Sequence, residues 1–103
     1  MIHIFTSVVN RPDFVKLQQQ LFKKFLKNEY KFHVVDDSVD ERISNEFKWV
    51  CKSNEVEYYR KPPVNKPMNP AQACAHTIQW SYDNLIKKNH SDDMFLVCAR
   101  QNF

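Results

Sequence analysis

Short apolar runs alternate along this chain with longer segments in which apolar residues recur every three or four positions. The first pattern indicates buried strands and the second indicates helices that cover a sheet. Strands that alternate with helices are typical of βαβ crossovers, which produce parallel sheets. The expected strands are 2–9, 32–35, 56–59 and 94–98, and the expected helices are about 12–27, 38–51 and 69–87. The sequence therefore predicts an α/β fold with a mainly parallel sheet and helices on both faces, a Rossmann-like three-layer α/β/α arrangement.

Residues at the expected helix starts support this order. Pro12 suits the first turn of a helix because its ring fixes φ. Ser38 and Glu41 have the spacing of a capping box, and Asn69-Pro70 predicts the start of the third helix. We expect the first helix to cover the sheet with one wide apolar face made of Phe14, Val15, Leu17, Leu21, Phe22, Phe25 and Leu26. For the third helix we expect Ala73, Cys74, Ile78, Leu85 and Ile86 to face inward.

Length and composition narrow the function classes. With 103 residues, 43% of them hydrophobic, the chain is expected to form one folded domain, residues 1–103. It contains no glycine, which disfavours both the dinucleotide-binding fingerprint and the P-loop, because each needs glycine for close approach to phosphate. A net charge of +3 with dispersed lysines lacks the basic stripe of a nucleic-acid-binding protein.

The apolar runs are all far shorter than the ~20 residues that a membrane span requires, and no charged leader precedes the first strand. We therefore expect a soluble, cytoplasmic protein without a transmembrane segment. Cys51, Cys74 and Cys98 are odd in number and lack CxxC spacing, so buried reduced thiols are favoured over a disulfide framework or a zinc site.

Candidate ligand-binding residues follow the expected strands. In an open parallel sheet, ligands bind at the carboxyl ends of strands near the point where strand order reverses. This rule selects 7–10 and 36–38, and then Arg60 and Lys61. The Asp36-Asp37 carboxylates can accept hydrogen bonds from a nucleobase N–H or from ribose hydroxyls, and Arg60 or Lys61 can approach phosphate. A turn and a helix cap explain the same residues without any ligand.

Two segments carry a family resemblance. Ile4-Phe5-Thr6-Ser7-Val8-Val9-Asn10-Arg11-Pro12-Asp13, and then Phe32-His33-Val34-Val35-Asp36-Asp37-Ser38, resemble the opening of family-2-like glycosyltransferases. The resemblance implies a GT-A fold that binds a nucleotide-sugar donor, UDP- or GDP-linked, and transfers the sugar to a hydroxyl acceptor. It extends over the chain in element order, but the motif-level similarity is confined to the first forty residues.

The resemblance also implies roles for individual residues. Ser7 matches the family's threonine near the nucleoside, and Asp37 matches the aspartate that hydrogen-bonds the base. Asn10 and Asp36 would support the same loops, and Arg60 completes the expected nucleotide-sugar-binding set. The third helix resembles the helix that borders the donor site in this family, where Gln72 and His76 are weaker candidates. For His76 a solvated helix position is the simpler interpretation.

Departures from the family pattern limit this expectation. Val9 stands where an aromatic residue is common, and Ser38 follows the aspartates directly where Gly-Ser is usual. The family's D-x-D motif, which binds Mn²⁺ or Mg²⁺ in the complete enzyme, would follow the fourth strand. That position reads Cys98-Ala99-Arg100-Gln101-Asn102-Phe103 and contains no acid. Asp92-Asp93 precedes the strand and fits a solvated turn at the opposite rim.

The leading hypothesis is thus the N-terminal, nucleotide-binding half of a truncated glycosyltransferase domain, without catalytic residues or a metal site and inactive alone. A shifted reading frame, a cloned fragment and a degenerate relative are all compatible with the ending. Such a half-domain would expose a sheet edge and favour self-association. The alternative hypothesis is a small non-enzymatic α/β interaction module in which the Asp pair is structural.

Overall fold

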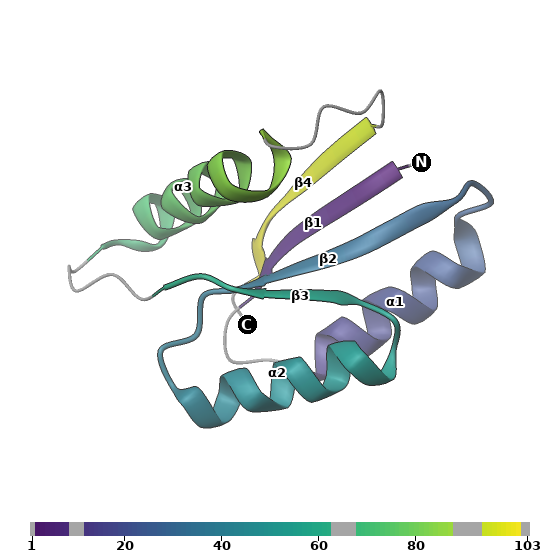
Figure 1. Cartoon of the computed structure of the whole chain (residues 1–103), viewed down its shortest axis with the longest axis horizontal. Coiled ribbons are helices and arrows are strands. Elements are labelled where there is room, and N and C mark those ends of the chain that lie inside the picture. The colour runs from purple at the N-terminus through teal and green to yellow at the C-terminus, as the bar shows by residue number, and fades with distance from the viewer. Residues whose placement is uncertain (1, 9–11, 63–67, 88–93, 102–103) are drawn as a thin grey trace.

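The computed structural model describes residues 2–8, 12–62, 68–87 and 94–101, and its elements follow the predicted alternation of strands and helices (Figure 1). In chain order they are β1 (Ile2–Val8), α1 (Asp13–Phe25), β2 (Tyr30–Asp36), α2 (Glu41–Ser53), β3 (Glu57–Arg60), α3 (Pro70–Ser81), the π-helical turn η1 (Tyr82–Ile86) and β4 (Met94–Gln101).

The described strands form one parallel sheet in the order β3-β2-β1-β4. The chain places β2 and β3 successively on one side of β1 and then returns to place β4 on the other side. Because βαβ crossovers are right-handed, this reversal puts α3 on the opposite face of the sheet from α1 and α2, as Figure 1 shows. The prediction of a small α/β domain with a parallel sheet is confirmed.

The apolar core lies between the sheet and the α1–α2 layer. Its buried members are Ile4, Val15, Phe32, Val34, Phe47, Cys51 and Val56. Phe32 and Phe47 are fully buried, and Phe22 of α1 meets Phe32 edge to face with ring centroids 5.0 Å apart. Each large apolar side chain buried in this way contributes about 1.5–3 kcal/mol, so this layer supplies much of the stability.

The prediction for α1 is correct about the helix but wrong about much of its buried face. Leu17, Leu21 and Phe25 are 48%, 46% and 67% exposed, whereas Val15 is fully buried. The side of α1 that contacts the rest of the domain also includes Gln19, 5% exposed. The apolar arc of α1 is wider than the surface that one sheet and one neighbouring helix can cover, so part of it faces solvent.

The polar side chain of Gln19 can be buried because its amide forms hydrogen bonds with groups that would otherwise bond to water. Its Nε2 donates to the backbone oxygen of Asn54 at 2.9 Å, and its Oε1 accepts from the hydroxyl of Tyr30 at 2.9 Å. These bonds tie the middle of α1 to the turn after α2 and to the start of β2. A buried polar group that is satisfied in this way costs little, whereas an unpaired one is destabilising.

The predicted capping box at Ser38 is wrong, because Asp40 is the N-cap of α2 and accepts a hydrogen bond from the backbone N–H of Arg42 at 2.9 Å. At α3 the prediction is confirmed. There Asn69 and Gln72 form a reciprocal capping box, with 2.8 Å from the Gln72 N–H to Asn69 Oδ1.

The inward side of α3 is more polar than predicted. Thr77 and Ser81, which are one turn apart, are 0% and 2% exposed, while the expected inward residue Ile78 is 36% exposed. The hydroxyl of Ser81 donates to the backbone oxygen of Thr77 at 2.8 Å, so the helix itself satisfies this buried group. The face of the sheet below α3 therefore meets hydroxyl groups as well as apolar ones.

The expectation of buried thiols is confirmed at Cys51 but not at Cys74, which is only partly buried. Cys51 and Cys74 are free thiols, Cys51 is buried, and burial raises its pKa to about 12. A thiol held protonated in this way is a poor nucleophile and a poor metal ligand. The Cys98 side chain lies outside the described part. In the described ranges, no helix combines the length and apolar character needed to cross a membrane.

Candidate functional site

The candidate site lies at the carboxyl edge of the sheet, where the ends of β1 and β2 are adjacent. Ser7 pairs with Val35 in the parallel register, and Val8 pairs with Asp36. Because side chains alternate between the faces of a sheet, Ser7, Val35 and Asp37 point to the α3 side, and Asp36 points to the α1–α2 side. The structure thus brings Ser7 and Asp37 to the same edge and face, and it separates the two neighbouring aspartates.

Asp36 stabilises the β2–α2 loop from the α1–α2 side of the sheet. It is fully buried, its Oδ1 accepts from the backbone N–H of Ser38 at 2.9 Å, and its Oδ2 accepts from the hydroxyl of Tyr58 at 2.7 Å. Burial, and then the bond to Asp36, raise the pKa of Tyr58, so its hydroxyl stays a donor. With both carboxylate oxygens bonded inside the protein, Asp36 holds the β2–α2 loop in place and does not face solvent.

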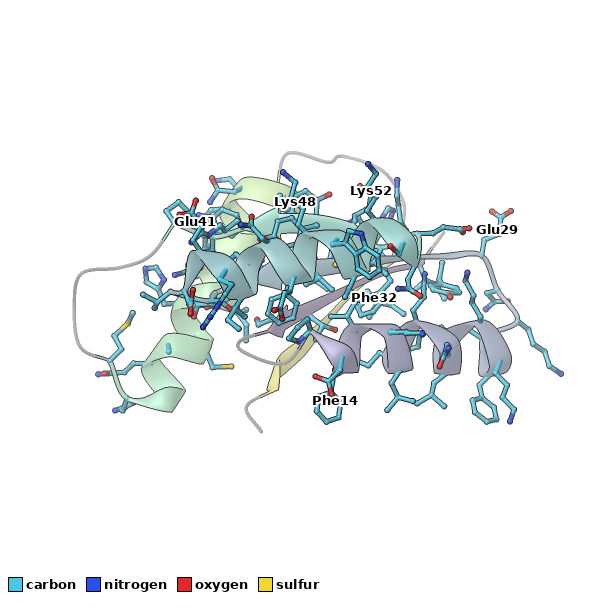
Figure 2. The ribbon with its side chains drawn as sticks, turned by 90° about the horizontal axis from the view of Figure 1, so that it is seen from below. Phe14, Glu29, Phe32, Glu41, Lys48 and Lys52 are labelled. Carbon is cyan, nitrogen blue, oxygen red and sulfur yellow. The ribbon has the colours of Figure 1, made fainter. Side chains whose placement is uncertain are left out.

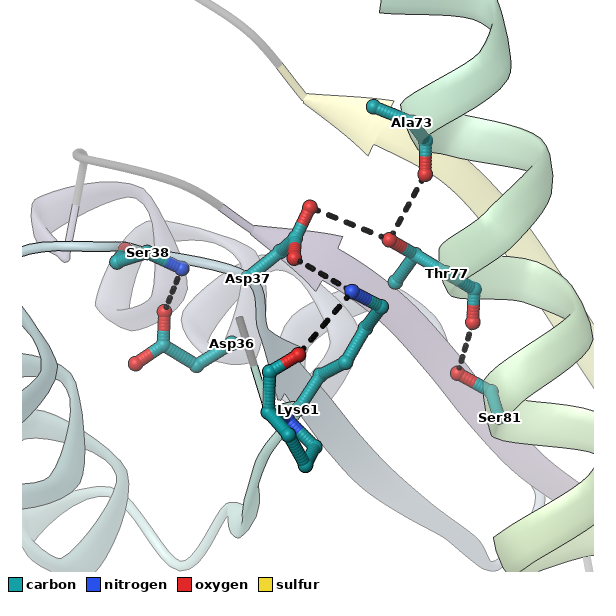
Figure 3. Close-up of polar contacts among 8 residues, drawn as sticks. Asp36, Asp37, Ser38, Lys61, Ala73, Thr77 and Ser81 are labelled. Carbon is teal, nitrogen blue, oxygen red and sulfur yellow. Dashed lines mark hydrogen bonds and ion pairs between the residues drawn. The ribbon is translucent and has the colours of Figure 1, made fainter. Parts of the chain in front are cut away.

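Asp37 belongs to a three-residue polar cluster with Lys61 and Thr77 (Figure 3). Its Oδ1 lies 3.1 Å from the Nζ of Lys61, and its Oδ2 lies 3.3 Å from the Oγ1 of Thr77. The Thr77 hydroxyl also lies 2.9 Å from the backbone oxygen of Ala73, and its single proton serves one acceptor at a time. This Asp37–Lys61–Thr77 cluster connects the end of β2, the residue after β3 and the middle of α3.

Burial makes this cluster electrostatically important. The side chains of Lys61 and Asp37 are 2% and 13% exposed, so each charge has lost most of its hydration. Such a pair is tolerated because the two charges compensate one another, and removing one partner leaves the other buried alone. The backbone N–H of Lys61 donates to the backbone oxygen of Asp36 at 2.9 Å, which extends the β2–β3 ladder and places Lys61 beside Asp37.

The other predicted site residues are not all at this cluster. Arg60 is the last residue of β3 and directly precedes Lys61. It pairs in register with Asp36 and is exposed on the α1–α2 side of the sheet, away from Asp37. Gln72 is used in the capping box of α3, and His76 is exposed on the same helix. Asn10 and Asp92-Asp93 lie outside the described residues.

Sequence reasoning named Lys61 only as an alternative to Arg60 and did not identify Thr77. Strand alternation could have selected Lys61, because Lys61 lies two positions after Tyr59 and therefore points to the same face of the sheet as Tyr59. No sequence signal identified Thr77, since a threonine in mid-helix normally bonds its own backbone. Its role depends on the fold placing the middle of α3 beside Asp37, the residue that follows β2.

A second polar cluster lies on the α3 side of the sheet, around His33. The Nε2 of His33 is 2.9 Å from the Nδ1 of His3, and its Nδ1 is 3.3 Å from the hydroxyl of Tyr59. Phe5 stacks on His33 with ring centroids 4.3 Å apart. Burial, and then the adjacent His3, lower the pKa of His33 to about 4, so His33 is neutral near pH 7.

The described residues form no metal centre, and a pocket that they line lies away from the predicted site. Among them, no group of three or more His, Cys, Asp or Glu side chains could hold a metal ion. A pocket of about 580 Å³ lies elsewhere, between the start of α1 and α2. It is lined by Pro12, Asp13, Arg42, Asn45, Glu46, Trp49 and Val50. Of the predicted nucleotide-sugar-binding residues that the structure describes, Ser7, Asp36, Asp37 and Arg60, none borders this pocket.

Comparison with known proteins adds no assignment to this geometry. No family model matches the sequence, and no curated protein or solved structure is significantly similar to it.

Proposed function

We propose that this chain is a glycosyltransferase-like domain of the GT-A type whose carboxyl sheet edge binds the nucleoside of a UDP- or GDP-linked sugar. One observation carries the proposal: Ser7 near the end of β1 and Asp37, the residue after the adjacent parallel strand β2, lie at the same edge and on the same face of the sheet. The family resemblance of the two segments assigns these residues the same roles.

Strand order supports this edge as the binding position. β1 continues into α1 on one face, whereas β4 is reached through α3 on the other face, so connections diverge between β1 and β4. Open α/β sheets bind ligands where connections diverge in this way, beyond the carboxyl ends of the strands. Ser7, near the end of β1, borders that position.

The surroundings of Asp37 suit recognition of a base. An ionised carboxylate accepts several hydrogen bonds at once, so a base N–H can be bound beside the bonds from Lys61 and Thr77. Those bonds also fix the carboxylate before a ligand arrives, which reduces the entropy lost on binding. Uracil and guanine both present an N–H donor at the edge that a carboxylate recognises.

The proposal assigns donor recognition and no catalytic step. A Mn²⁺ or Mg²⁺ ion would neutralise the donor diphosphate in a complete family enzyme, but the described residues do not form a metal-binding group. The activity that we expect of this chain is nucleotide binding.

Calorimetric titration with UDP and GDP tests the proposal, with AMP as the comparison nucleotide. The expected result is binding of UDP or GDP that weakens by about tenfold or more in Asp37→Asn, because a charged hydrogen bond contributes about 1.5–3 kcal/mol. Asp83→Asn is the matched control, because Asp83 is an exposed carboxylate in η1, and it should bind like the wild type.

A double variant guards against loss of folding. Asp37→Asn leaves Lys61 buried without its countercharge, so Asp37→Asn combined with Lys61→Met removes both charges and keeps the side-chain volumes. If this folded variant binds UDP and GDP as tightly as the wild type, Asp37 does not recognise the base and the proposal fails.

The Asp37–Lys61 pair itself favours a second candidate, a non-enzymatic α/β interaction module in which the carboxylate is structural. That candidate predicts no response to any nucleotide and a loss of stability in Asp37→Asn. The same titration, read together with urea unfolding, separates the two functions.

A further inference from the structure

The outer flank of α1 presents an apolar stripe made of Phe14, Leu17, Leu21 and Phe25. Leu17, Leu21 and Phe25 are 48%, 46% and 67% exposed, and Phe14 is half-buried. Figure 2 shows Phe14 on the side of α1 that faces away from α2. The four residues recur at steps of three and four, so they lie in one row along the helix. We call this row the α1 stripe.

The α1 stripe is separate from the side of the helix that forms the core. Val15 is fully buried and Phe22 packs on Phe32, while Gln19 bonds to the turn after α2. A contiguous apolar row outside the core is a feature of protein interaction surfaces rather than of ordinary solvated helices.

Opposite charges flank the two ends of the α1 stripe. Asp13 lies four residues before Leu17, and Lys24 lies three residues after Leu21, so each is a helical neighbour of the stripe. The Nζ of Lys24 is 5.4 Å from the ring centroid of Phe25. Lys23 instead forms an ion pair with Glu55, in which the Nζ of Lys23 is 3.8 Å from the Oε2 of Glu55.

This charge pattern selects one pairing geometry. Two copies of the stripe placed parallel would set Asp13 near Asp13 and Lys24 near Lys24. Two copies placed antiparallel set each Asp13 near the Lys24 of the other copy, and Leu17 opposite Leu21. A two-fold interface requires this kind of self-complementarity. If a residue of one copy contacts a second residue of the other copy, the reverse contact is also made. Antiparallel helix dipoles also attract one another.

We propose that the α1 stripe is a homodimerisation surface, on which a second copy of this chain docks its own α1 antiparallel about a two-fold axis between Leu17 and Leu21. This inference is independent of nucleotide binding, because the α1 stripe and the Asp37–Lys61–Thr77 cluster lie on different elements. It also differs from pairing through a sheet edge, which would use backbone groups of β3 or β4.

The size of the surface sets the expected affinity. The thirteen residues of α1 make a helix about 20 Å long, at about 1.5 Å per residue. One helix pair of this length falls at the small end of specific interfaces, which are typically weak and transient. We therefore expect a concentration-dependent dimer with a Kd of roughly tens to hundreds of micromolar.

Sedimentation velocity over a wide range of protein concentration, with reductant present to prevent disulfide dimers, measures this equilibrium. Leu21→Glu should weaken the dimer by about tenfold or more, because it places a carboxylate at the centre of the apolar contact. Val39→Glu is the matched control, since Val39 is 80% exposed and lies outside α1. It should dimerise like the wild type.

Charge exchange tests the antiparallel geometry. Asp13→Lys and Lys24→Asp should each weaken self-association by about fivefold, because both symmetric ion pairs become like-charge contacts. An equimolar mixture of these two variants should recover dimer formation. One variant then carries a lysine at both positions and the other an aspartate at both, so an antiparallel pair of unlike chains joins opposite charges at each end. Circular dichroism confirms that the variants remain helical.

Any of the following results would overturn the proposal. A wild-type chain that stays monomeric at millimolar concentration has no such interface. If Leu21→Glu leaves the dimer intact, the dimer uses another surface. If Trp49→Glu then disrupts that dimer, the pocket between α1 and α2 is the interface. A mixture of charge variants that stays as weak as its components rules out antiparallel pairing.

Discussion

The two faces of the sheet differ in chemistry although the same strands build both. Toward α1 and α2 the strands present Ile4, Phe32 and Val34, which are buried in an apolar layer. Toward α3 they present polar groups together with Phe5 and Val35. These polar groups are His3, Ser7, His33, Tyr59 and, just beyond the strand ends, Asp37 and Lys61. The first face stabilises the fold mainly through apolar area removed from water, with a Tyr58–Asp36 hydrogen bond at its carboxyl end, and the second depends on specific hydrogen bonds and an ion pair.

This difference indicates which face of the sheet suits a polar ligand. An apolar layer is non-directional, so it tolerates small shifts but has little to offer a polar ligand. A layer of satisfied polar groups is directional, and changing one partner alters the others. We therefore propose that a polar ligand binds on the α3 side, where binding would be coupled to stability, and substitutions at Phe47, Asp37 and His33 test this contrast.

The largest effect is expected in the apolar layer. Phe47→Ala removes a fully buried ring from the centre of the core and should lower the free energy of unfolding by about 3–5 kcal/mol. Urea unfolding followed by circular dichroism measures the loss. Trp49→Ala on the same helix, where the side chain is 70% exposed, should cost much less. Equal losses at the two positions would mean that the α2 layer does not form the core.

An intermediate effect is expected at the Asp37–Lys61 pair. Asp37→Asn leaves the ammonium of Lys61, whose side chain is 2% exposed, without a countercharge and should cost about 2–4 kcal/mol. Asp37→Asn combined with Lys61→Met should recover most of that loss, because a matched apolar side chain replaces the buried ion. Thermal unfolding at pH 7 compares the variants. If the double variant is less stable than the single one, the ion pair does not act as a unit.

A smaller, pH-dependent effect is expected at His33. The folded state keeps His33 neutral down to about pH 4, whereas the unfolded chain takes up a proton near the ordinary value of 6.5. Below pH 6.5 the unfolded state therefore binds more protons, so stability falls as pH drops from 6.5 to 4. The expected loss is about 1–2 kcal/mol.

His33→Gln should remove this part of the pH dependence, and His76→Gln, at an exposed position of α3, should retain it. Urea midpoints measured at several pH values between 4 and 7 give the comparison. A wild-type curve that matches His33→Gln throughout this range would show that His33 is not the group responsible.

Element order was predictable from the sequence because it depends on local periodicity. The apolar run at Ile2–Val8 and the Asn69-Pro70 start of α3 are each contained in one short segment. The adjacency of Ser7 and Asp37 was also predictable once the sheet was inferred to be parallel. The cap of α2 was misassigned because Ser38 and Asp40 are both good N-cap residues, and only the path of the loop selects one.

The composition of the site was less predictable because it depends on residues far apart in sequence. Thr77 reaches Asp37 across a separation of 40 residues, and Gln19 bonds Asn54 across 35. A hydroxyl or an amide in a helix gives no local sign of such a partner. The exposure of Leu17 and Leu21 was missed for a related reason, since an apolar pattern shows that a face can be buried but not what is available to cover it.

By itself, the sequence determined the alternation of strands and helices, the parallel sheet and the edge at which Ser7 and Asp37 meet. These follow from periodicity, capping and the right-handed crossover, which act over short stretches of chain. The tertiary structure decided that Asp36 turns inward while Asp37 pairs with Lys61 and Thr77, and that the α1 stripe stays outside the core. Those outcomes depend on which surfaces meet in space, and burial energies and buried charges respond to that arrangement alone.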